Sequence, residues 1–190
     1  MKKALSAFAV SFALTASLTA SAAAQTASWR QVVGIILANN VVGVGTGAVP
    51  GGFLPWTTTS GNARVNLQSG QIRFSVRGLV FAAGAPAINI GTPGPVTAVK
   101  GVLVCDSNGS AGDGNSVVVE TPSVPLSSTG DADFSGNIGP LPSACTSEPD
   151  IAFLVRASAF GGQATEGPWI ANGAVLVMNG DNGDKHNGRD

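Results

Sequence analysis

Helix-breaking residues restrict this chain more than any other feature. The 190 residues include 26 glycines and 11 prolines. After residue 25, no window of ten or more residues that has the apolar spacing of a helix is free of glycine and proline. Apolar and polar residues instead alternate with a period of two, as in strands with one buried face. Such runs, separated by Gly- and Pro-rich turns, predict an all-β fold: a single antiparallel, Ig-like β-sandwich of about seven to ten strands.

The expected strands fall into three groups. Clear alternation marks four of them: Ala63–Leu67, Ile72–Val76, Ala132–Ile138 and Ile151–Val155. More continuous apolar runs predict two central strands, Val32–Ala38 and Val96–Cys105. The set is completed by Val117–Glu120 and by Trp169–Ala171 and Ala174–Met178, the last two joined by a tight Asn172-Gly173 turn.

The first hairpin allows a more detailed prediction. Its inward positions are odd in the first strand and even in the second, so a plain three-residue loop would bury Arg73. The turn must therefore contain a bulge or be four residues long, and Gly70 can supply the left-handed residue of a G1 bulge. This register places Val65 opposite Phe74 and Asn66 opposite Arg73.

The first 24 residues have the layout of a secretory signal peptide. A basic start, Met1-Lys2-Lys3, precedes the uncharged run Ala4–Ala20, and small residues lead to a cleavage point after Ala24, or alternatively after Ala22. The sequence of this segment is typical of bacterial signal peptides. The segment therefore predicts a secreted or periplasmic protein. The mature chain is then a β domain, 25–178, followed by a disordered polar tail, 179–190. No second apolar run of about 20 residues follows, so we expect no membrane span in the mature chain.

Charged residues are scarce, which narrows the expected partners. They make up 11% of the chain, against about a quarter in typical domains. Removal of residues 1–24 takes away Lys2 and Lys3, leaving eight basic and eleven acidic residues and a net charge of −3. A nucleic-acid partner held by a basic patch is therefore not expected. A single histidine also cannot form a multi-histidine metal site.

Two segments resemble known families. The run Thr59–Val65, continued to Arg77-Gly78-Leu79, resembles the hairpin of CHRD-type extracellular β modules, and Gly94-Pro95-Val96 is similar to their Gly-Pro-Val strand entry. The characteristic histidines of that family are absent here. The segments 142–145 and 153–156 resemble secreted bacterial proteins of uncharacterised function. These resemblances favour the Ig-like sandwich and imply no activity.

The two cysteines, Cys105 and Cys145, are expected to form a disulfide, because an exported chain with an even cysteine count usually pairs them. The chain has no Cys-x-x-Cys motif, and the body of the chain has no histidine that would lower the pKa of a thiol. Nothing in the sequence therefore supports a reactive cysteine. In the chain-entropy model, the closed loop of about 40 residues corresponds to roughly 4 kcal/mol as an upper-end stabilisation.

No group of residues in the sequence points clearly to catalysis, so we do not expect an enzyme. His186 is the only imidazole and lies in the polar tail, where a Ser-His-Asp triad would lack a rigid base. Asp131 and Asp133 share one face of a strand about 7 Å apart, a separation suited to paired glycosidase carboxylates. The alternative is that both carboxylates simply lie on a solvated outer face. The same alternative holds for Glu148 and Asp150, which flank Pro149 in a loop.

No cofactor is expected, although a calcium site is a weak candidate. The segment that contains Asp106, Asn108 and Asp113 is rich in oxygen donors. It lacks the glycine at position six and the glutamate at position twelve of an EF-hand loop. A solvated Gly/Asp/Asn loop is the competing interpretation.

The candidate ligand-binding residues are Trp56, Arg64, Arg73 and Arg77. The three arginines project from the outer face of the first hairpin, where they suit a carboxylate, a sulfate or an acidic glycan. Trp56 lies in a Gly/Pro-rich loop and is the tryptophan we expect to be exposed, whereas Trp169 is expected in the core.

These observations lead to three functional hypotheses. The first is an exported, non-catalytic module that binds a glycan or a protein at the cell surface or outside the cell. The second is a self-associating structural or matrix protein with low-charge, Gly-rich β surfaces. The third is a hydrolase that works through carboxylates.

Overall fold

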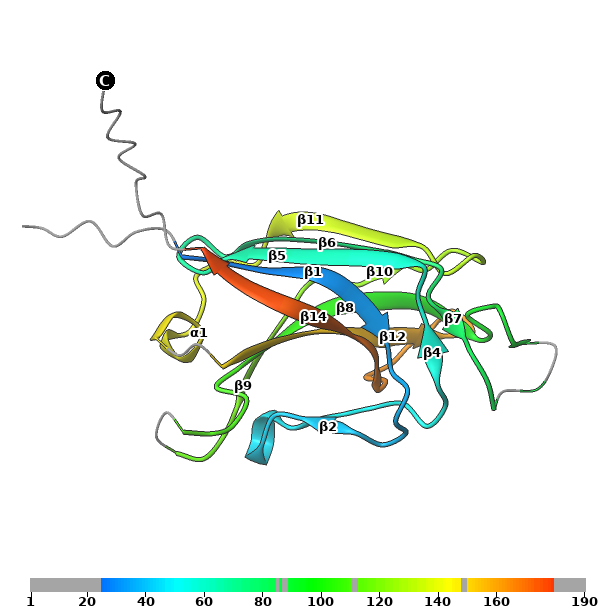
Figure 1. Cartoon of the computed structure of the whole chain (residues 1–190), viewed down its shortest axis with the longest axis horizontal. Helices are drawn as coiled ribbons and strands as arrows, with labels where there is room; N and C mark the ends of the chain where they lie inside the picture. The colour runs from blue at the N-terminus through cyan, green and yellow to red at the C-terminus, as the bar shows by residue number, and fades with distance from the viewer. Residues whose placement is uncertain (1–24, 85, 87–88, 111–112, 148–149, 180–190) are drawn as a thin grey trace, which may run out of the picture.

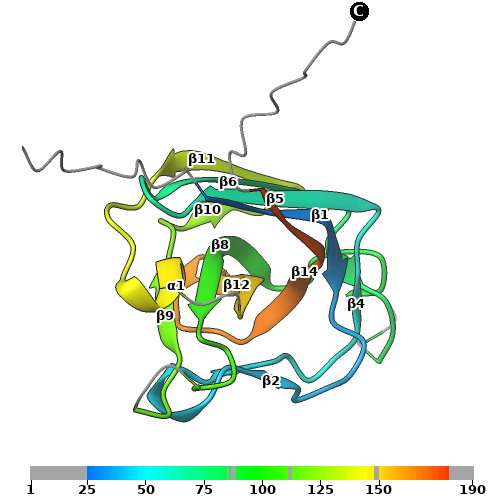
Figure 2. The same ribbon diagram turned by 60° about the vertical axis from the view of Figure 1, so that its left-hand side comes forward.

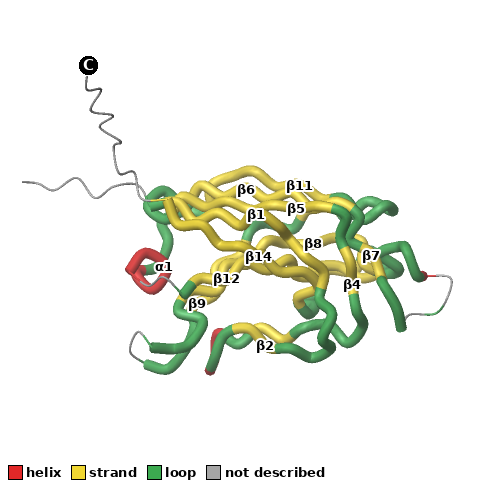
Figure 3. Tube along the Cα trace, viewed as in Figure 1, coloured by secondary structure: helices red, strands yellow, loops and turns green. Residues whose placement is uncertain are grey.

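The computed structural model describes residues 25–84, 86, 89–110, 113–147 and 150–179, so the predicted signal peptide and residues 180–190 of the tail lie outside it. Strands dominate, and the single α-helix of the described ranges is the short α1 (Ser143–Ser147) at one end of the molecule (Figure 3). The predicted all-β class and the antiparallel pairing are confirmed. None of the helices described here has the length and apolar character needed to cross a membrane.

One ten-stranded sheet forms the body of the molecule (Figure 1). Eight of its strands follow one path, in this order: β10 (Val124–Pro125), β8 (Val96–Cys105), β12 (Ile151–Phe160), β14 (Trp169–Asn179), β1 (Thr26–Gly34), β5 (Ser60–Asn66), β6 (Gln71–Arg77) and β11 (Ala132–Asn137). The other two extend it at the sides: β9 (Val117–Glu120) beside β8 and β13 (Gln163–Ala164) beside β12. Two small ladders pair β2 (Val41–Val42) with β3 (Val49–Pro50) and β4 (Trp56–Thr57) with β7 (Val80–Phe81). A 3-10 turn, η1 (Gly45–Gly47), precedes β3.

The large sheet curls over itself, so that β1, β5, β6 and β11 lie above β8 and β12 (Figure 2). The long strand β14 makes the bend, because its first residues pair with β12 and the rest pair with β1. An Ig-like sandwich was predicted, whereas here both layers belong to one continuous hydrogen-bonded sheet. The core fills the space between the layers.

An aromatic cluster occupies the centre of that core. Phe153 is fully buried and lies with its ring centroid 5.5 Å from that of Trp29 and 5.7 Å from that of Phe74. Gly101 faces the cluster, where a Cβ atom would come within 2.9 Å of the Phe74 ring. Leu154, the next residue along β12, is also fully buried, and β12 lies between β8 and β14 in the sheet.

The first central strand was placed too far along the chain. The prediction was Val32–Ala38, but β1 begins at Thr26 and ends at Gly34. Beyond it, Ile36 and Leu37 are 79% and 72% exposed. The strand ends at Gly34, where a Cβ atom would lie 2.2 Å from the Trp56 carbonyl oxygen. A continuous apolar run gives no periodicity that would show which part of it is buried.

The predicted Asn172-Gly173 turn is also wrong, because both residues lie inside β14. Gly173 is required by packing: a Cβ atom there would lie 2.5 Å from Cδ1 and Cγ of the buried Trp29. A glycine within a strand often marks such a close approach rather than a turn.

We therefore expect Gly173→Ala to lower the free energy of unfolding by about 1–3 kcal/mol, the usual cost of overpacking a core. Gly52→Ala is the matched control, since its Cβ atom would meet its nearest neighbours at an ordinary 3.6 Å. Urea denaturation of both variants measures the difference. Equal losses would contradict the assigned contact with Trp29.

The β5–β6 hairpin confirms the predicted faces but not the predicted partners. Its loop is four residues long, one of the two forms expected, and Gly70 has a φ of 69°. Arg64 lies opposite Arg73, and Val65 lies opposite Ile72, two residues away from the predicted Phe74. The faces were still correct because a shift of two residues preserves the alternation of a strand.

Candidate functional site

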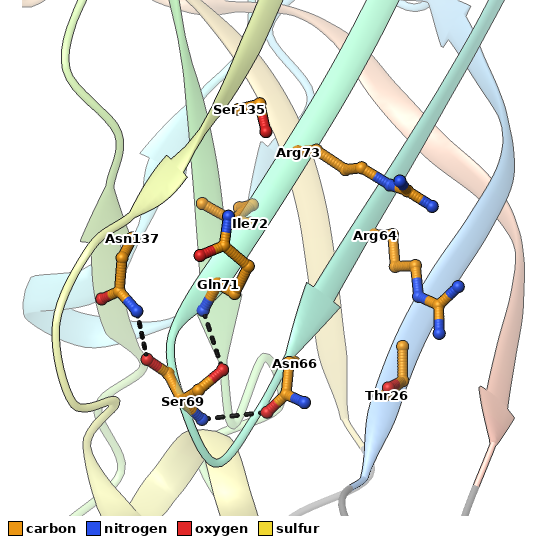
Figure 4. A pocket seen from close by; sticks show the side chains of 9 residues that line it. All are labelled: Thr26, Arg64, Asn66, Ser69, Gln71, Ile72, Arg73, Ser135 and Asn137. Carbon is orange, nitrogen blue, oxygen red and sulfur yellow. Dashed lines mark hydrogen bonds between the residues drawn. The ribbon is translucent and has the colours of Figure 1, made fainter.

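An open pocket of about 590 Å³ lies on the outer face of the β5–β6 hairpin (Figure 4). Its lining is polar apart from one buried isoleucine, and two arginines stand at one side of it. The lining residues are Thr26, Arg64, Asn66, Ser69, Gln71, Ile72, Arg73, Ser135 and Asn137.

Strand register explains why these side chains meet. Arg64 and Arg73 are direct cross-strand partners, and Ser28 and Ser135 extend their row onto β1 and β11. A second row places Thr26 opposite Asn66 and Gln71 opposite Asn137. Alternation along each strand sends these residues to the outer face while their neighbours fill the core. We refer to these two rows as the arginine face.

The arginine pair has no counter-charge of its own. In the described parts of the chain, neither the Arg64 nor the Arg73 guanidinium makes a hydrogen bond or an ion pair, and both side chains are exposed. Figure 4 shows both groups extending toward β1 from adjacent strands. Like charges directly opposite each other on a sheet disfavour folding slightly, so the pair has no evident structural benefit.

Hydrogen bonds order the amide side chains at the opposite end of the pocket. Asn66 Oδ1 accepts from the Ser69 N–H at 2.9 Å, and Asn137 Nδ2 donates to the Ser69 carbonyl oxygen at 2.8 Å. The Gln71 N–H donates to Ser69 Oγ at 3.3 Å. The turn is thereby tied to β11, and the amide groups of Asn66 and Asn137 are held in place.

No protein-family model, curated protein or solved structure matches this chain. The resemblances to CHRD-type modules and to secreted bacterial proteins therefore remain predictions.

The structure separates the third predicted arginine from this pair. Arg77 lies at the far end of β6, where Nη2 donates to Asp133 Oδ1 at 2.8 Å. Its other contacts are the carbonyl oxygens of Val76 and Ala132. Arg77 is thus a structural residue that joins β6 to β11.

Trp56 was predicted to be exposed, and that prediction is wrong. Its side chain is 4% exposed, and its ring centroid lies 4.1 Å from that of Phe81 across the β4–β7 ladder. The Gly/Pro-rich loop forms a short strand pair that folds against the sheet, which composition alone does not reveal. Trp169 is buried, as predicted.

The predicted disulfide is present. Cys105 and Cys145 are bonded, with their Cα atoms 4.8 Å apart and both side chains fully buried. The bond attaches α1 to the end of β8. The described ranges contain no free cysteine.

The proposed acidic pair is held in its ionised form. The Gly78 N–H and the Thr129 hydroxyl donate to Asp131, at 3.0 and 2.9 Å, and lower the pKa of its carboxyl group. The hydrogen bond from Arg77 lowers the pKa of Asp133. A glycosidase general acid instead needs a raised pKa. Of the other two acidic candidates, Glu148 lies outside the described residues, and the Asp150 carboxylate accepts a hydrogen bond from Asn108 Nδ2.

The calcium candidates serve as turn caps. The Ser110 N–H lies 2.8 Å from both Asp106 Oδ1 and Asn108 Oδ1, and Asp113 Oδ1 accepts from the Asn115 N–H at 2.9 Å. Within the part of the chain that the structure describes, no three His, Cys, Asp or Glu residues gather as metal ligands.

Sequence reasoning missed a four-membered ion cluster on the other layer. Lys100 and Arg156 are cross-strand partners on β8 and β12, and both bind Glu120 and Glu166. Lys100 Nζ contacts Glu166 Oε1 at 2.7 Å, and Arg156 Nη1 contacts Glu120 Oε1 at 2.9 Å. Glu166 belongs to a loop, so only the folded chain brings these four charges together.

Two serines lie near this cluster, and either would be a nucleophile if Lys100 acted as its base. Ser123 Oγ and Ser158 Oγ are within hydrogen-bonding distance, and both line a pocket with Lys100. Burial lowers the pKa of Lys100, but its hydrogen bonds to Glu120 and Glu166 outweigh burial and raise the pKa overall. A lysine that acts as a base needs a lowered pKa, so the cluster is better understood as a structural clamp.

The carboxylate contacts predict the acid stability of the protein. Hydrogen bonds from the Gly78 N–H to Asp131, from Arg77 to Asp133 and from Lys100 to Glu166 lower the pKa of each carboxyl group from ordinary values of 3.8, 3.8 and 4.5. A lowered folded-state pKa gives stability that is present above the unfolded-state value and is lost as the pH falls. We expect the free energy of unfolding to decline below about pH 4.5.

Urea titrations across this range measure that decline. The double variant Asp133→Asn/Glu166→Gln should be less stable near neutral pH and should show a shallower acid slope. An unchanged slope would contradict the assigned contacts.

Proposed function

We propose that this protein is an exported, non-catalytic module whose arginine face binds a glycan that carries carboxylate groups. The observation that carries the proposal is the adjacent pair Arg64 and Arg73, exposed and without a counter-charge among the described residues. Amide and hydroxyl side chains border the pair in the same pocket.

The chemistry of the face suits an acidic sugar. A guanidinium group presents a planar fork that matches a carboxylate through two parallel hydrogen bonds. Asn66, Gln71 and Asn137 offer donors and acceptors of the kind that sugar hydroxyl groups need. Two guanidinium groups from adjacent strands can hold one carboxylate together or two in succession along a chain.

Other partner classes fit this face less well. A nucleic acid would require several more cations and aromatic platforms for its bases, and no aromatic side chain lines this pocket. A protein interface is usually centred on buried aromatic anchors. Neutral sugars usually stack on exposed tryptophan, whereas all three tryptophans here are buried.

Export is part of the proposal and rests on two observations. The sequence of residues 1–24 has the layout of a cleaved signal peptide. The Cys105–Cys145 disulfide is typical of proteins that fold in an oxidising compartment. The Ig-like character of the fold is a separate prediction, and neither of these two observations bears on it.

Titration calorimetry with tetragalacturonate tests the binding site. Arg64→Gln and Arg73→Gln should each weaken binding roughly 10-fold or more, because a hydrogen bond to a charged group contributes about 1.5–3 kcal/mol. Neither change should lower the free energy of unfolding, since each removes a like-charge contact. Binding should also weaken as salt is added.

Arg30→Gln is the control for a general charge effect. Arg30 is an exposed arginine of β1 that does not line the pocket. Its loss should leave the affinity nearly unchanged, and the neutral maltotetraose should bind none of these proteins. Equal weakening by Arg30→Gln and Arg64→Gln would refute the site.

A further inference from the structure

A second pocket, of about 280 Å³, includes Trp56 of β4 and Phe81 of β7 in its lining. Figure 1 shows these two strands at the opposite end of the molecule from the β5–β6 turn. The walls of the pocket are apolar, and four aromatic side chains contribute to them: Phe53, Trp56, Phe81 and Phe160. Phe53 is 75% exposed and Phe160 is 36% exposed. Large apolar side chains exposed around one pocket are characteristic of a ligand site.

The walls of this pocket are firmly built. Trp56 and Phe81 are cross-strand partners whose ring centroids lie 4.1 Å apart. The backbone N–H of Trp56 donates to the Ile35 carbonyl oxygen at 2.7 Å, and the backbone N–H of Gly52 donates to the Trp169 carbonyl oxygen at 2.9 Å. These bonds attach the segment that contains Phe53, on both sides of that residue, to Ile35 just after β1 and to β14.

The indole N–H of Trp56 is the decisive feature. The side chain is 96% buried, yet Nε1 donates to no group in the described ranges. Every fully buried side-chain N or O atom described by the structure has a hydrogen-bond partner. Nε1 must therefore reach accessible space, and it lies 3.9 Å from the position that a Cβ atom of Gly52 would occupy at the pocket wall.

We propose that this pocket binds an uncharged, ring-containing molecule with an oxygen acceptor, independently of the glycan site. The volume is just below the usual range for small-molecule pockets, which suits a ligand of one or two rings. A charged group would lose its hydration with no opposite charge nearby, because no ionisable side chain lines the pocket. A carbonyl, ether or hydroxyl oxygen of the ligand would accept from Trp56 Nε1.

Gly52 provides a way to fill the pocket without disturbing the fold. A Cβ atom there would meet Ile170 Cγ2 and the Trp169 carbonyl oxygen at 3.6 Å, ordinary contact distances. Ile170 and Trp56 both line the pocket. A valine at position 52 would therefore occupy ligand space, and thermal unfolding of Gly52→Val checks that the fold is intact.

Fluorine NMR with two probes tests the proposal: 4-fluoroacetophenone, which carries a carbonyl acceptor, and 1-ethyl-4-fluorobenzene, which has a similar shape without one. Both should bind the native protein, and Gly52→Val should weaken both about 10-fold. Trp56→Phe keeps an aromatic ring beside Phe81 but lacks the N–H. It should weaken the carbonyl probe about 3- to 10-fold more than the ethyl probe, the effect of one lost hydrogen bond.

Leu176→Ala is the control, because Leu176 is an exposed apolar residue of β14 that does not line the pocket. Binding of both probes should be unchanged in this variant. Absence of binding to the native protein, or equal weakening of the two probes by Trp56→Phe, would overturn the proposal. The Trp56→Phe comparison decides the question even if Gly52→Val fails to fold. Either result leaves the arginine face untouched, so the two proposals fail separately.

Discussion

Replacing Phe153 by alanine is expected to lower the free energy of unfolding by about 3–5 kcal/mol, the usual cost of truncating a buried phenylalanine. Phe153 is fully buried and contacts both Trp29 and Phe74. Its neighbours belong to strands of one continuous sheet, so the two layers cannot close readily over the space left behind. The cost should therefore lie in the upper part of this range.

Arg73→Ala is the matched change on the opposite face of the sheet and should cost well under 1 kcal/mol. Urea denaturation followed by tryptophan fluorescence compares the two variants. A loss at Arg73 as large as that at Phe153 would show that the inner and outer faces have been assigned the wrong way round.

Reduction of the Cys105–Cys145 disulfide should lower the free energy of unfolding by about 2–4 kcal/mol. The bond closes a 40-residue separation that includes β9, β10 and β11, and it attaches α1 to β8. Loss of the bond mainly frees the unfolded chain, so the sheet should persist when the bond is reduced.

The double variant Cys105→Ala/Cys145→Ala should show the same loss and should no longer respond to reductant. Far-ultraviolet circular dichroism checks that its β structure remains. Two titratable thiols in the native exported protein would refute the bond and reopen the question of a reactive cysteine.

Alternation of apolar and polar residues predicted part of the local β structure, and continuous apolar runs predicted another part. Alternation identified the buried faces of β5 and β6, and the bounds of β8 were predicted correctly at Val96–Cys105. The turn predicted from the Asn172-Gly173 dipeptide was wrong, because packing against Trp29 requires the glycine inside a strand. Local patterns do not show which distant side chain a glycine must accommodate.

The candidate site was predicted only in part for the same reason. Strand alternation placed Arg64 and Arg73 outward, but the cross-strand register decides that they are direct partners while Arg77 pairs with Asp133. The hydroxyl and amide groups of β1 and β11 join the pocket through pairings between distant segments. Nothing local in the sequence marks the cluster around Lys100, whose partners come from three other parts of the chain.

Heteronuclear NMR of the native protein during titration with tetragalacturonate tests the proposed function most directly. We predict that shift changes will concentrate on the residues of the arginine face, and that the side-chain Nε–H signals of Arg64 and Arg73 will move while that of Arg30 stays in place. Shift changes concentrated elsewhere on the molecule, or none at saturating concentrations of the oligosaccharide, would contradict the assignment of the arginine face as an acidic-glycan site.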